Sequence, residues 1–199
     1  MKKKTKQPLK IGLTGGIGSG KTTISSIFES LNIPVFNSDQ ISKYILQDNK
    51  RVIETIVQKF GKTIIKNNQI NTAKLAKIVF SDKTKLATLN NIIHPHVLNK
   101  FNDWIRNQDS KYIIKESAIL FESKTYQQLD KIILVQSPLH IRIERTCKRD
   151  NRTKEDVKKI IKNQIKDTEA IKYADYIIKN NNKLLLPKII QLHEVLSNL

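Results

Sequence analysis

Cysteine is almost absent from this chain, which has a single one, Cys147, among 199 residues. One cysteine cannot form an internal disulfide, so a disulfide-stabilised secreted fold is excluded, and we interpret Cys147 as an incidental free thiol. The N-terminal Met1-Lys2-Lys3-Lys4 is followed by polar residues instead of the apolar run of about 7–15 residues that a signal peptide requires. We therefore expect a cytoplasmic protein that is neither secreted nor membrane-spanning.

The sequence also lacks internal repeats, long linkers and low-complexity tracts beyond its first eight residues. With 199 residues it has the length of one domain, with room for a modest insertion and a substantial hydrophobic core. We predict a flexible basic N-terminus over residues 1–8 and one domain over residues 9–199.

Acidic residues are scarce: 18 Asp and Glu stand against 36 Lys and Arg, a net charge of +18. Such a balance suits nucleic-acid binding, in which Lys and Arg neutralise phosphates. The Lys residues are scattered along the whole chain, however, as in a protein with a biased overall composition. We favour the second interpretation and expect no nucleic-acid partner, although the charge still favours phosphate-rich small ligands.

Short β-branched and apolar runs alternate with helical patterns along most of the chain. The run at 9–14 ends in a glycine-rich loop, and residues 21–31 then show apolar residues at helical spacing. Similar runs predict further strands at 33–36, 112–114, 131–135 and 175–178. Because strand-helix-strand crossovers join parallel strands, the alternation predicts an α/β three-layer sandwich around a five-stranded parallel sheet.

Two helical segments do not fit a plain alternation. Residues 40–108 show repeated helical spacing and no strand pattern, more than one crossover needs, so we interpret them as a helical insertion that binds a substrate. Residues 138–166 are helical and strongly basic, and we interpret them as a lid.

The glycine-rich loop carries the most specific motif. Gly15-Gly16-Ile17-Gly18-Ser19-Gly20-Lys21-Thr22 matches G-x-x-x-x-G-K-[ST] at every position and lies between a predicted strand and a predicted helix. A simple glycine-rich turn is the weaker alternative, because the motif is complete and its context is correct. The motif predicts a P-loop NTPase fold and ATP binding.

Each residue type in the loop has a chemical reason. Glycines bring backbone N–H groups close to phosphate oxygens, and the helix N-terminus adds partial positive charge. Lys21 is expected to reach the β- and γ-phosphates, and the Thr22 hydroxyl to bind the Mg²⁺ that bridges them. The other nucleotide contacts are expected from Gly15, Gly18, Ser19, Gly20 and Thr23.

A carboxylate follows the second predicted strand. Asp39 lies just past its C-terminal end, at the sheet edge where open α/β sheets bind ligands. An acid there can orient a hydroxyl and accept its proton, or it can cap a helix that begins near Gln40. The position of Asp39 alone leaves both roles open, and one Asp could serve both.

Arginine is rare, with six residues, and four of them fall within residues 142–152. Their spacing, i, i+3, i+7, i+10, would place Arg142, Arg145, Arg149 and Arg152 on one helix face if the helix continues that far. Guanidinium groups bind phosphate oxygens bidentately, so we predict a phosphate-binding face in preference to a merely solvated one.

The wording of several segments is narrower than the general motif. Gly12-Leu13-Thr14-Gly15-Gly16-Ile17-Gly18-Ser19-Gly20-Lys21-Thr22 resembles the P-loop of the dephospho-CoA kinase family. Further segments follow in the family's order and spacing over about residues 9–196: Asn37-Ser38-Asp39, Phe60-Gly61, His94-Pro95, Leu120-Phe121-Glu122, Arg145…Arg149-Asp150, Gln164, Ala174-Asp175 and Asn180.

This resemblance implies ATP-dependent phosphorylation of the ribose 3′-hydroxyl of dephospho-CoA, the last step of coenzyme A synthesis, with ATP and Mg²⁺. It implies that Asp39 engages that hydroxyl, that Lys21, Arg145 and Arg149 stabilise the transferred charge, and that Asn180 lies near the adenine of ATP. We expect a monomer or a small homo-oligomer.

The chain also departs from the family pattern. Asn37 and Thr72 stand where the family has Asp and Arg. The first departure puts a metal-linked role of position 37 in doubt, and the second means that one acceptor-phosphate contact is either lost or taken over by Lys74 or Lys77. Glu116 could hold a magnesium-bound water or end a strand as a turn residue, and His94 is interpreted as structural or pocket-lining. A nucleoside or nucleoside monophosphate kinase and an ATP-regulated nucleic-acid binder remain the competing hypotheses.

Overall fold

The computed structural model describes residues 7–199, and the chain divides into two compact units. One unit combines the described residues up to Asn37 with Ile105–Leu199, and the other is Ser38–Trp104. Most of the predicted N-terminus, residues 1–8, lies outside the described residues.

The first unit is built on a five-stranded sheet with the order β2-β5-β1-β6-β7, in which all paired strands are parallel. The strands are β1 (Leu9–Thr14), β2 (Val35–Asn37), β5 (Tyr112–Glu116), β6 (Lys131–Gln136) and β7 (Tyr176–Lys179). They lie within two residues of the predicted runs. The α/β class and the five-stranded parallel sheet are confirmed.

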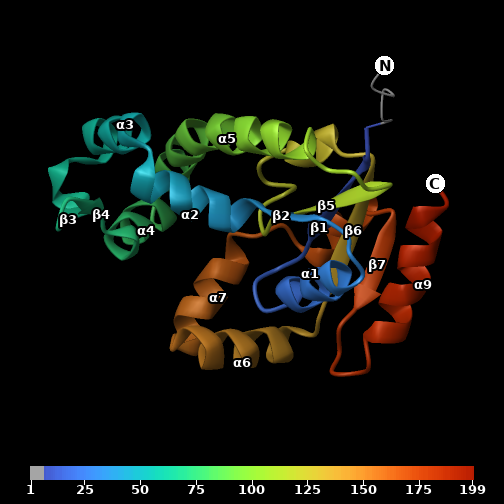
Figure 1. Ribbon diagram of the computed structural model, residues 1–199. Coiled ribbons are helices and arrows are strands. Elements are labelled where there is room, and N and C mark those ends of the chain that lie inside the picture. The colour runs from blue at the N-terminus through green and yellow to red at the C-terminus, as the bar shows by residue number, and fades with distance from the viewer. Residues whose placement is uncertain (1–6) are drawn as a thin grey trace, which may run out of the picture. The chain divides into compact units, whose positions relative to one another are not determined.

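Helices cover both faces of this sheet (Figure 1). On one face, α1 (Lys21–Ser30) and α9 (Leu186–Ser197) contribute Phe28 and Ile189 to a core that also contains Ile11, Tyr112 and Ile133 of the sheet. A smaller cluster on the other face joins side chains of β6 to the segment after β5 and to the short helix α8 (Asp167–Ala170): Leu120, Phe121, Ile132, Leu134 and Ala170. Burial on both faces explains why the central strands read as nearly continuous apolar runs.

Two helices follow β6, namely α6 (Leu139–Asp150) and α7 (Lys154–Lys162). Asn151 ends α6 in the left-handed conformation, with φ 50°, and the Thr153 hydroxyl accepts a hydrogen bond from the Asp156 N–H at the start of α7. The basic segment is therefore helical but broken. Arg152 lies between the helices, so the expectation that it shares one helix face with Arg142, Arg145 and Arg149 is wrong.

The second unit is mainly helical. It contains α2 (Ser38–Asp48), α3 (Lys50–Phe60) and α4 (Thr72–Phe80), and α5 (Lys83–Ile105) runs one residue beyond it. The expectation of helices alone is wrong for residues 65–70, where β3 (Ile65–Lys66) and β4 (Gln69–Ile70) form an antiparallel hairpin. Its turn residues, Asn67 and Asn68, both have positive φ, the combination that a two-residue type I′ hairpin turn requires.

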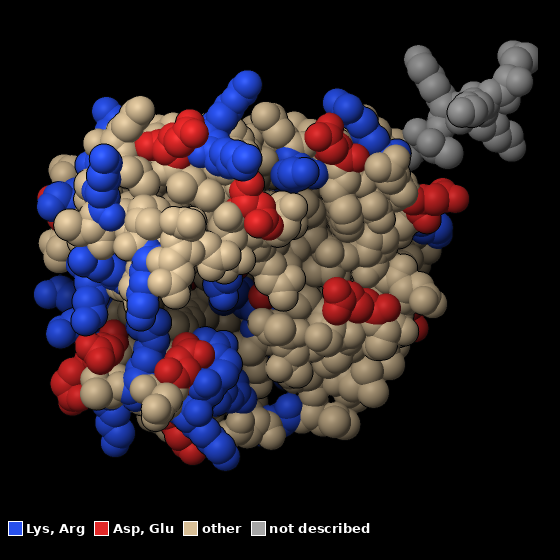
Figure 2. Space-filling view, turned by 60° about the vertical axis from the view of Figure 1, so that its left-hand side comes forward, with Lys and Arg blue, Asp and Glu red and all other residues tan. Residues whose placement is uncertain are grey.

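Lys and Arg are spread over much of the face in Figure 2, with Asp and Glu among them. No helix within residues 7–199 is both long and apolar enough to cross a membrane.

Candidate functional site

The glycine-rich loop joins the C-terminal end of β1 to the first residue of α1. Gly18 and Gly20 have φ 74° and 94°, conformations that residues with a Cβ rarely adopt. A Cβ on Gly20 would also collide with the Asn180 amide, and one on Gly15 with the Val135 carbonyl. Backbone strain and close packing thus both require glycine, and the loop ends at the N-terminus of α1, the strand-loop-helix context that the motif predicts.

Lys21 lies within this loop. Its side chain is buried, and its Nζ donates hydrogen bonds to the carbonyl oxygens of Gly15, at 2.8 Å, and Gly16, at 3.5 Å. The ammonium group is therefore held against the backbone carbonyls of the loop, and its contact with phosphates stays a prediction.

A buried hydroxyl gives an independent test of whether the loop fits a phosphate. Ser19 is 1% exposed, and its Oγ is one of a few buried side-chain polar atoms in the described part of the chain that have no hydrogen-bond partner. A buried hydroxyl without a partner is costly unless a ligand supplies one. The residues of the loop thus fit an anion with several acceptor oxygens.

Glu116, the last residue of β5, is the main acid of the first unit near the loop. Its carboxylate is 3% exposed and accepts hydrogen bonds from the hydroxyls of Thr22, at 3.3 Å, and Ser25, at 2.8 Å. The Asn37 amide donates a third, at 3.2 Å, from the neighbouring strand β2. An ionised Asp at position 37 could not donate this hydrogen bond. The Asn that replaces the family's Asp therefore makes a contact with Glu116 that the Asp could not make.

Sequence reasoning left Glu116 undecided between a magnesium-linked and a turn residue. The hydrogen bond between the Thr22 hydroxyl and Glu116 favours the magnesium-linked interpretation. The register of β2, β5 and β1 brings Asn37 and Glu116 together at the end of the sheet from which the P-loop begins. The signal available in the sequence was an acid at the carboxyl end of a central strand. Thr22 and Thr23 both lie exposed on the first turn of α1.

Asn180 and Arg145 reach the loop from two other elements. Asn180 follows β7, is 5% exposed and donates from Nδ2 to the Ser19 carbonyl at 2.8 Å. Arg145 of α6 donates to Asn180 Oδ1 at 3.1 Å, to Asn182 Oδ1 at 2.6 Å and to the Gly18 carbonyl at 3.5 Å. Asn182 has φ 63°, a left-handed conformation that Asn adopts more readily than most residues.

The Arg142 side chain points toward the P-loop backbone instead of toward solvent, the direction that the prediction of a phosphate-binding face required. Its side chain is buried, donates from Nε to the Ile17 carbonyl at 3.0 Å and lies 3.5 Å from the Asp167 carboxylate. Burial lowers the pKa of Arg142, and the negative charge of Asp167 partly opposes this shift. The expectation of a guanidinium displayed for phosphate on an open helix face is wrong for Arg142, because that group packs against the loop backbone.

Arg149 does not join this cluster. Its guanidinium forms a bidentate pair with Asp150, at 2.7 and 2.8 Å, and the hydrogen bonds that it donates to the Asp150 carboxylate raise the pKa of Arg149. Its side chain is 60% exposed. The predicted role of Arg149 in catalysis and nucleotide binding stays a prediction.

Asp39 belongs to the second unit, in which it lies in the first turn of α2. The helix begins at Ser38 instead of near Gln40, so Asp39 is within the helix and is not its N-cap. An acid in the first turn still interacts favourably with the helix dipole. His94 lies within α5, and Thr72 is the first residue of α4, directly after its N-cap Asn71.

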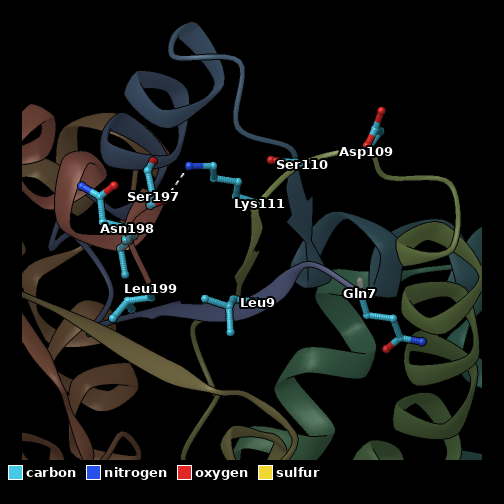
Figure 3. Close-up of a pocket in the computed structure, with 9 residues that line it drawn as sticks. Gln7, Leu9, Asp109, Ser110, Lys111, Ser197, Asn198 and Leu199 are labelled. Atoms are coloured by element: carbon cyan, nitrogen blue, oxygen red, sulfur yellow. Dashed lines mark hydrogen bonds between the residues drawn. The ribbon is translucent and has the colours of Figure 1, made fainter. Parts of the chain in front are cut away.

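A cavity of about 570 Å³ lies at the opposite edge of the sheet (Figure 3). It is lined by Leu9 at the start of β1, by residues preceding β5 and by the end of α9, where Lys111 Nζ donates to the Ser197 carbonyl at 2.9 Å. The P-loop follows the other end of β1, so this cavity is separate from the nucleotide site. Within residues 7–199 no group of three or more His, Cys, Asp or Glu side chains is arranged to hold a metal ion.

Comparison with known proteins agrees with this geometry. The family model described as dephospho-CoA kinase matches residues 9–185. This chain belongs to the dephospho-CoA kinase family. It is similar to the dephospho-CoA kinase of Fusobacterium nucleatum, with 42% identity over 175 residues that cover 87% of this chain and 90% of that protein. The Bacteroides fragilis enzyme is 36% identical over 186 residues, 92% of this chain and 91% of that protein.

Solved structures support the same assignment. A Thermus thermophilus protein superposes with a TM-score of 0.84 at 26% identity, covering 98% of this chain and 99% of that one. Dephospho-CoA kinase from Campylobacter jejuni gives 0.69 at 28% identity, with 95% and 97% covered. A shikimate kinase from Acinetobacter baumannii, at 0.55 and 19% identity, shares the fold alone. The predicted family and P-loop NTPase fold are confirmed; this kinase family uses ATP as its substrate.

Proposed function

We propose that this chain transfers the γ-phosphate of ATP to the ribose 3′-hydroxyl of dephospho-CoA, giving coenzyme A and ADP. The observation that carries the proposal is a complete P-loop between β1 and α1 in a chain that matches the dephospho-CoA kinase family over residues 9–185. The motif supports nucleotide binding, and the family match selects the acceptor, which the fold alone could not do.

The phosphates of ATP would be held by the loop backbone from Gly15 to Thr23 and by the ammonium group of Lys21. Arg145 and Asn180, which contact the loop at Gly18 and Ser19, would engage the nucleotide beside it. Arg149 is proposed to stabilise the transferred phosphoryl group, which requires its guanidinium to leave Asp150.

Magnesium fits this site through the Thr22 hydroxyl. Mg²⁺ in kinase sites typically takes one or two protein ligands, several waters and the substrate phosphates, so a cage of three or more acids is not needed. Thr22 would bind the ion directly, and Glu116, 3.3 Å from the Thr22 hydroxyl, would hold a bound water. When bound, the ion neutralises charge that develops on the β- and γ-phosphates.

Asp39 is proposed to orient the 3′-hydroxyl and to accept its proton as the ribose oxygen bonds to the γ-phosphorus. The bond from that phosphorus to the β–γ bridging oxygen breaks at the same centre, and ADP leaves with the electron pair. We further propose a cytosolic enzyme that binds no nucleic acid and acts as a monomer or small homo-oligomer.

Identification of the phosphorylated product tests the reaction. The purified chain is incubated with Mg-ATP and a panel that contains dephospho-CoA, nucleosides and nucleoside monophosphates, and the products are separated by mass spectrometry. Coenzyme A formed from dephospho-CoA is the expected result. Consumption of ATP without coenzyme A, or faster phosphorylation of a nucleoside monophosphate, would overturn the proposal.

The role of Asp39 has its own test. We predict that Asp39→Asn lowers kcat by at least about 100-fold with little loss of ATP affinity, because the hydroxyl loses its proton acceptor. Single-turnover kinetics and calorimetric ATP titration measure the two effects. Asp48→Asn, an exposed acid at the end of the same helix, serves as the matched control. Near-normal turnover in Asp39→Asn would contradict the catalytic role and leave Asp39 as a residue that stabilises α2.

A further inference from the structure

The apex of the P-loop is held by side chains that belong to the segment after β6. Gln164 Oε1 accepts a hydrogen bond from the Ile17 N–H at 2.9 Å, and Arg142 Nε donates one to the Ile17 carbonyl at 3.0 Å. Arg142 Nη2 also donates to Gln164 Oε1, at 3.4 Å. Both backbone polar groups of Ile17 thus form hydrogen bonds with side chains that lie more than 120 residues later in the sequence.

The same segment packs closely against the glycines on either side of Ile17. A Cβ on Gly16 would collide with the Arg142 guanidinium, and one on Gly18 with the Arg142 carbonyl oxygen. The Arg142 carbonyl in turn accepts the hydroxyl of Thr146, at 2.8 Å, which is fully buried. The loop apex is therefore packed closely against the first two turns of α6.

This arrangement addresses a specific difficulty of a glycine-rich loop. Glycines let the backbone approach a phosphate, but they also have the largest conformational entropy to lose when the loop becomes ordered. The Ile17 N–H belongs to the planar peptide unit shared with Gly16, and the Ile17 C=O belongs to the planar unit shared with Gly18. Holding both groups therefore restricts the φ and ψ torsions of Ile17 between the two planes. Ordering that occurs before the ligand binds does not reduce the affinity for the ligand.

We propose that Arg142 and Gln164 are positioning residues that preorganise the phosphate loop for ATP through the backbone of Ile17. Gln164 acts through its carbonyl oxygen, which receives both N–H groups, and Arg142 acts through Nε. The inference rests on the proposed function for its ligand, ATP, but it does not depend on which molecule accepts the phosphate.

The test compares two variants of Gln164 with similar size. Gln164→Glu keeps an oxygen that accepts from Ile17 and Arg142, whereas Gln164→Met removes the acceptor. We expect Gln164→Met to weaken calorimetric ATP binding about tenfold, and Gln164→Glu to stay within about threefold of the parent chain, as loss and retention of hydrogen bonds to a loop imply. The exposed acid Glu169, changed to Gln, is the control in the same segment.

A second measurement reports on the loop itself in the ATP-free protein. Hydrogen exchange at the Ile17 amide should be at least about tenfold faster in Gln164→Met than in Gln164→Glu, since only the first lacks the acceptor. Steady-state kinetics should show a raised KM for ATP with a smaller change in the KM for dephospho-CoA. Arg142→Met should give the same pattern without adding fully to Gln164→Met, because both side chains act on the backbone of one residue, Ile17, and contact each other.

Equal ATP affinities and equal Ile17 exchange rates in the two Gln164 variants would overturn the inference. So would a lowered melting temperature in Gln164→Met with unchanged ATP affinity, which would mark a purely structural contact. If Arg142→Met does not fold, the Gln164 pair still decides. Because ATP binding is measured without an acceptor, failure here is distinguishable from failure of the proposed reaction.

Discussion

Glu116 is the acidic side chain of the proposed magnesium site. It is buried and accepts from three donors, Thr22, Ser25 and Asn37. We predict that Glu116→Gln lowers kcat at least about tenfold and raises the Mg²⁺ concentration needed for half-maximal rate, since an amide cannot hold a magnesium-bound water as strongly as a carboxylate. Magnesium titrations of the initial rate measure both.

The exposed acid Glu29 of α1, changed to Gln, controls for a general loss of negative charge near this helix. A Glu116→Gln variant with an unchanged magnesium titration would assign Glu116 to structure alone.

Lys115, the neighbour of Glu116 on β5, bears on stability instead of catalysis. Its side chain is 2% exposed, and burial lowers the pKa of Lys115 to about 8 from an ordinary 10.5. Between these values the folded state binds fewer protons than the unfolded state, so this residue makes the free energy of unfolding rise with pH from about 8 to about 10.5. Below pH 8 the full destabilisation, on the order of 3 kcal/mol, is present.

We therefore predict that Lys115→Met stabilises the protein at pH 7 and flattens the pH dependence of stability between about pH 8 and 10. Urea unfolding at a series of pH values measures this. The exposed Lys179, changed to Met, should leave the slope of the parent chain intact. An identical slope in Lys115→Met would show that other groups cause it.

The roles of individual residues could be predicted from the sequence to different degrees. The P-loop was fully predictable, because every position of the motif has a local reason. Arg142 and Gln164 were not, because their role depends on a contact with Ile17 that only the folded chain creates. Arg spacing indicated one phosphate-binding face, but burial of Arg142 and the pairing of Arg149 with Asp150 separate these side chains.

At the scale of elements, the break between α6 and α7 is fixed by one residue. Asn151 ends α6 with φ 50° and ψ 45°, a left-handed conformation that costs residues other than Gly and Asn roughly 1–2 kcal/mol. We predict that Asn151→Ala lowers the free energy of unfolding by about 1 kcal/mol, whereas Asn151→Gly leaves it unchanged or raises it. Chemical denaturation of the three proteins measures the difference.

Asn163 offers the matched control, since it ends α7 with an ordinary φ of −90°. Asn163→Ala should therefore have a much smaller effect. Similar losses for both Ala variants would mean that the backbone conformation at Asn151 is not what limits stability there.

Strand positions were predictable to within two residues because buried parallel strands leave short, dense apolar runs with clear limits. The hairpin at residues 65–70 was missed, since two-residue strands carry no alternation and its Asn67-Asn68 turn reads as one polar pair among many in an Asn-rich chain. The break at Asn151 was missed because the sequence does not show which of its many Asn residues adopt the left-handed conformation.

At the scale of the whole molecule, the net charge of +18 should act on kinetics. ATP and dephospho-CoA are both anionic, and long-range attraction is screened beyond about 10 Å at 0.1 M ionic strength. We predict that kcat/KM falls several-fold between about 0.05 and 0.4 M KCl while kcat changes less. Initial rates at fixed pH and magnesium measure this, and a salt-independent kcat/KM would contradict it.

The strand order has a consequence for how the chain is made. β1 is the central strand, yet its two neighbours are β5 and β6, so Leu9 waits for Tyr112 before its ladder can form. At a synthesis rate of roughly 5–20 residues per second, about 100 residues correspond to about 5–20 s in which the nascent β1 has no strand to pair with. The whole of Ser38–Trp104 leaves the ribosome in this interval. The strand that leads into the P-loop is thus an unpaired apolar segment during this interval, and we expect ribosome-associated chaperones to bind it.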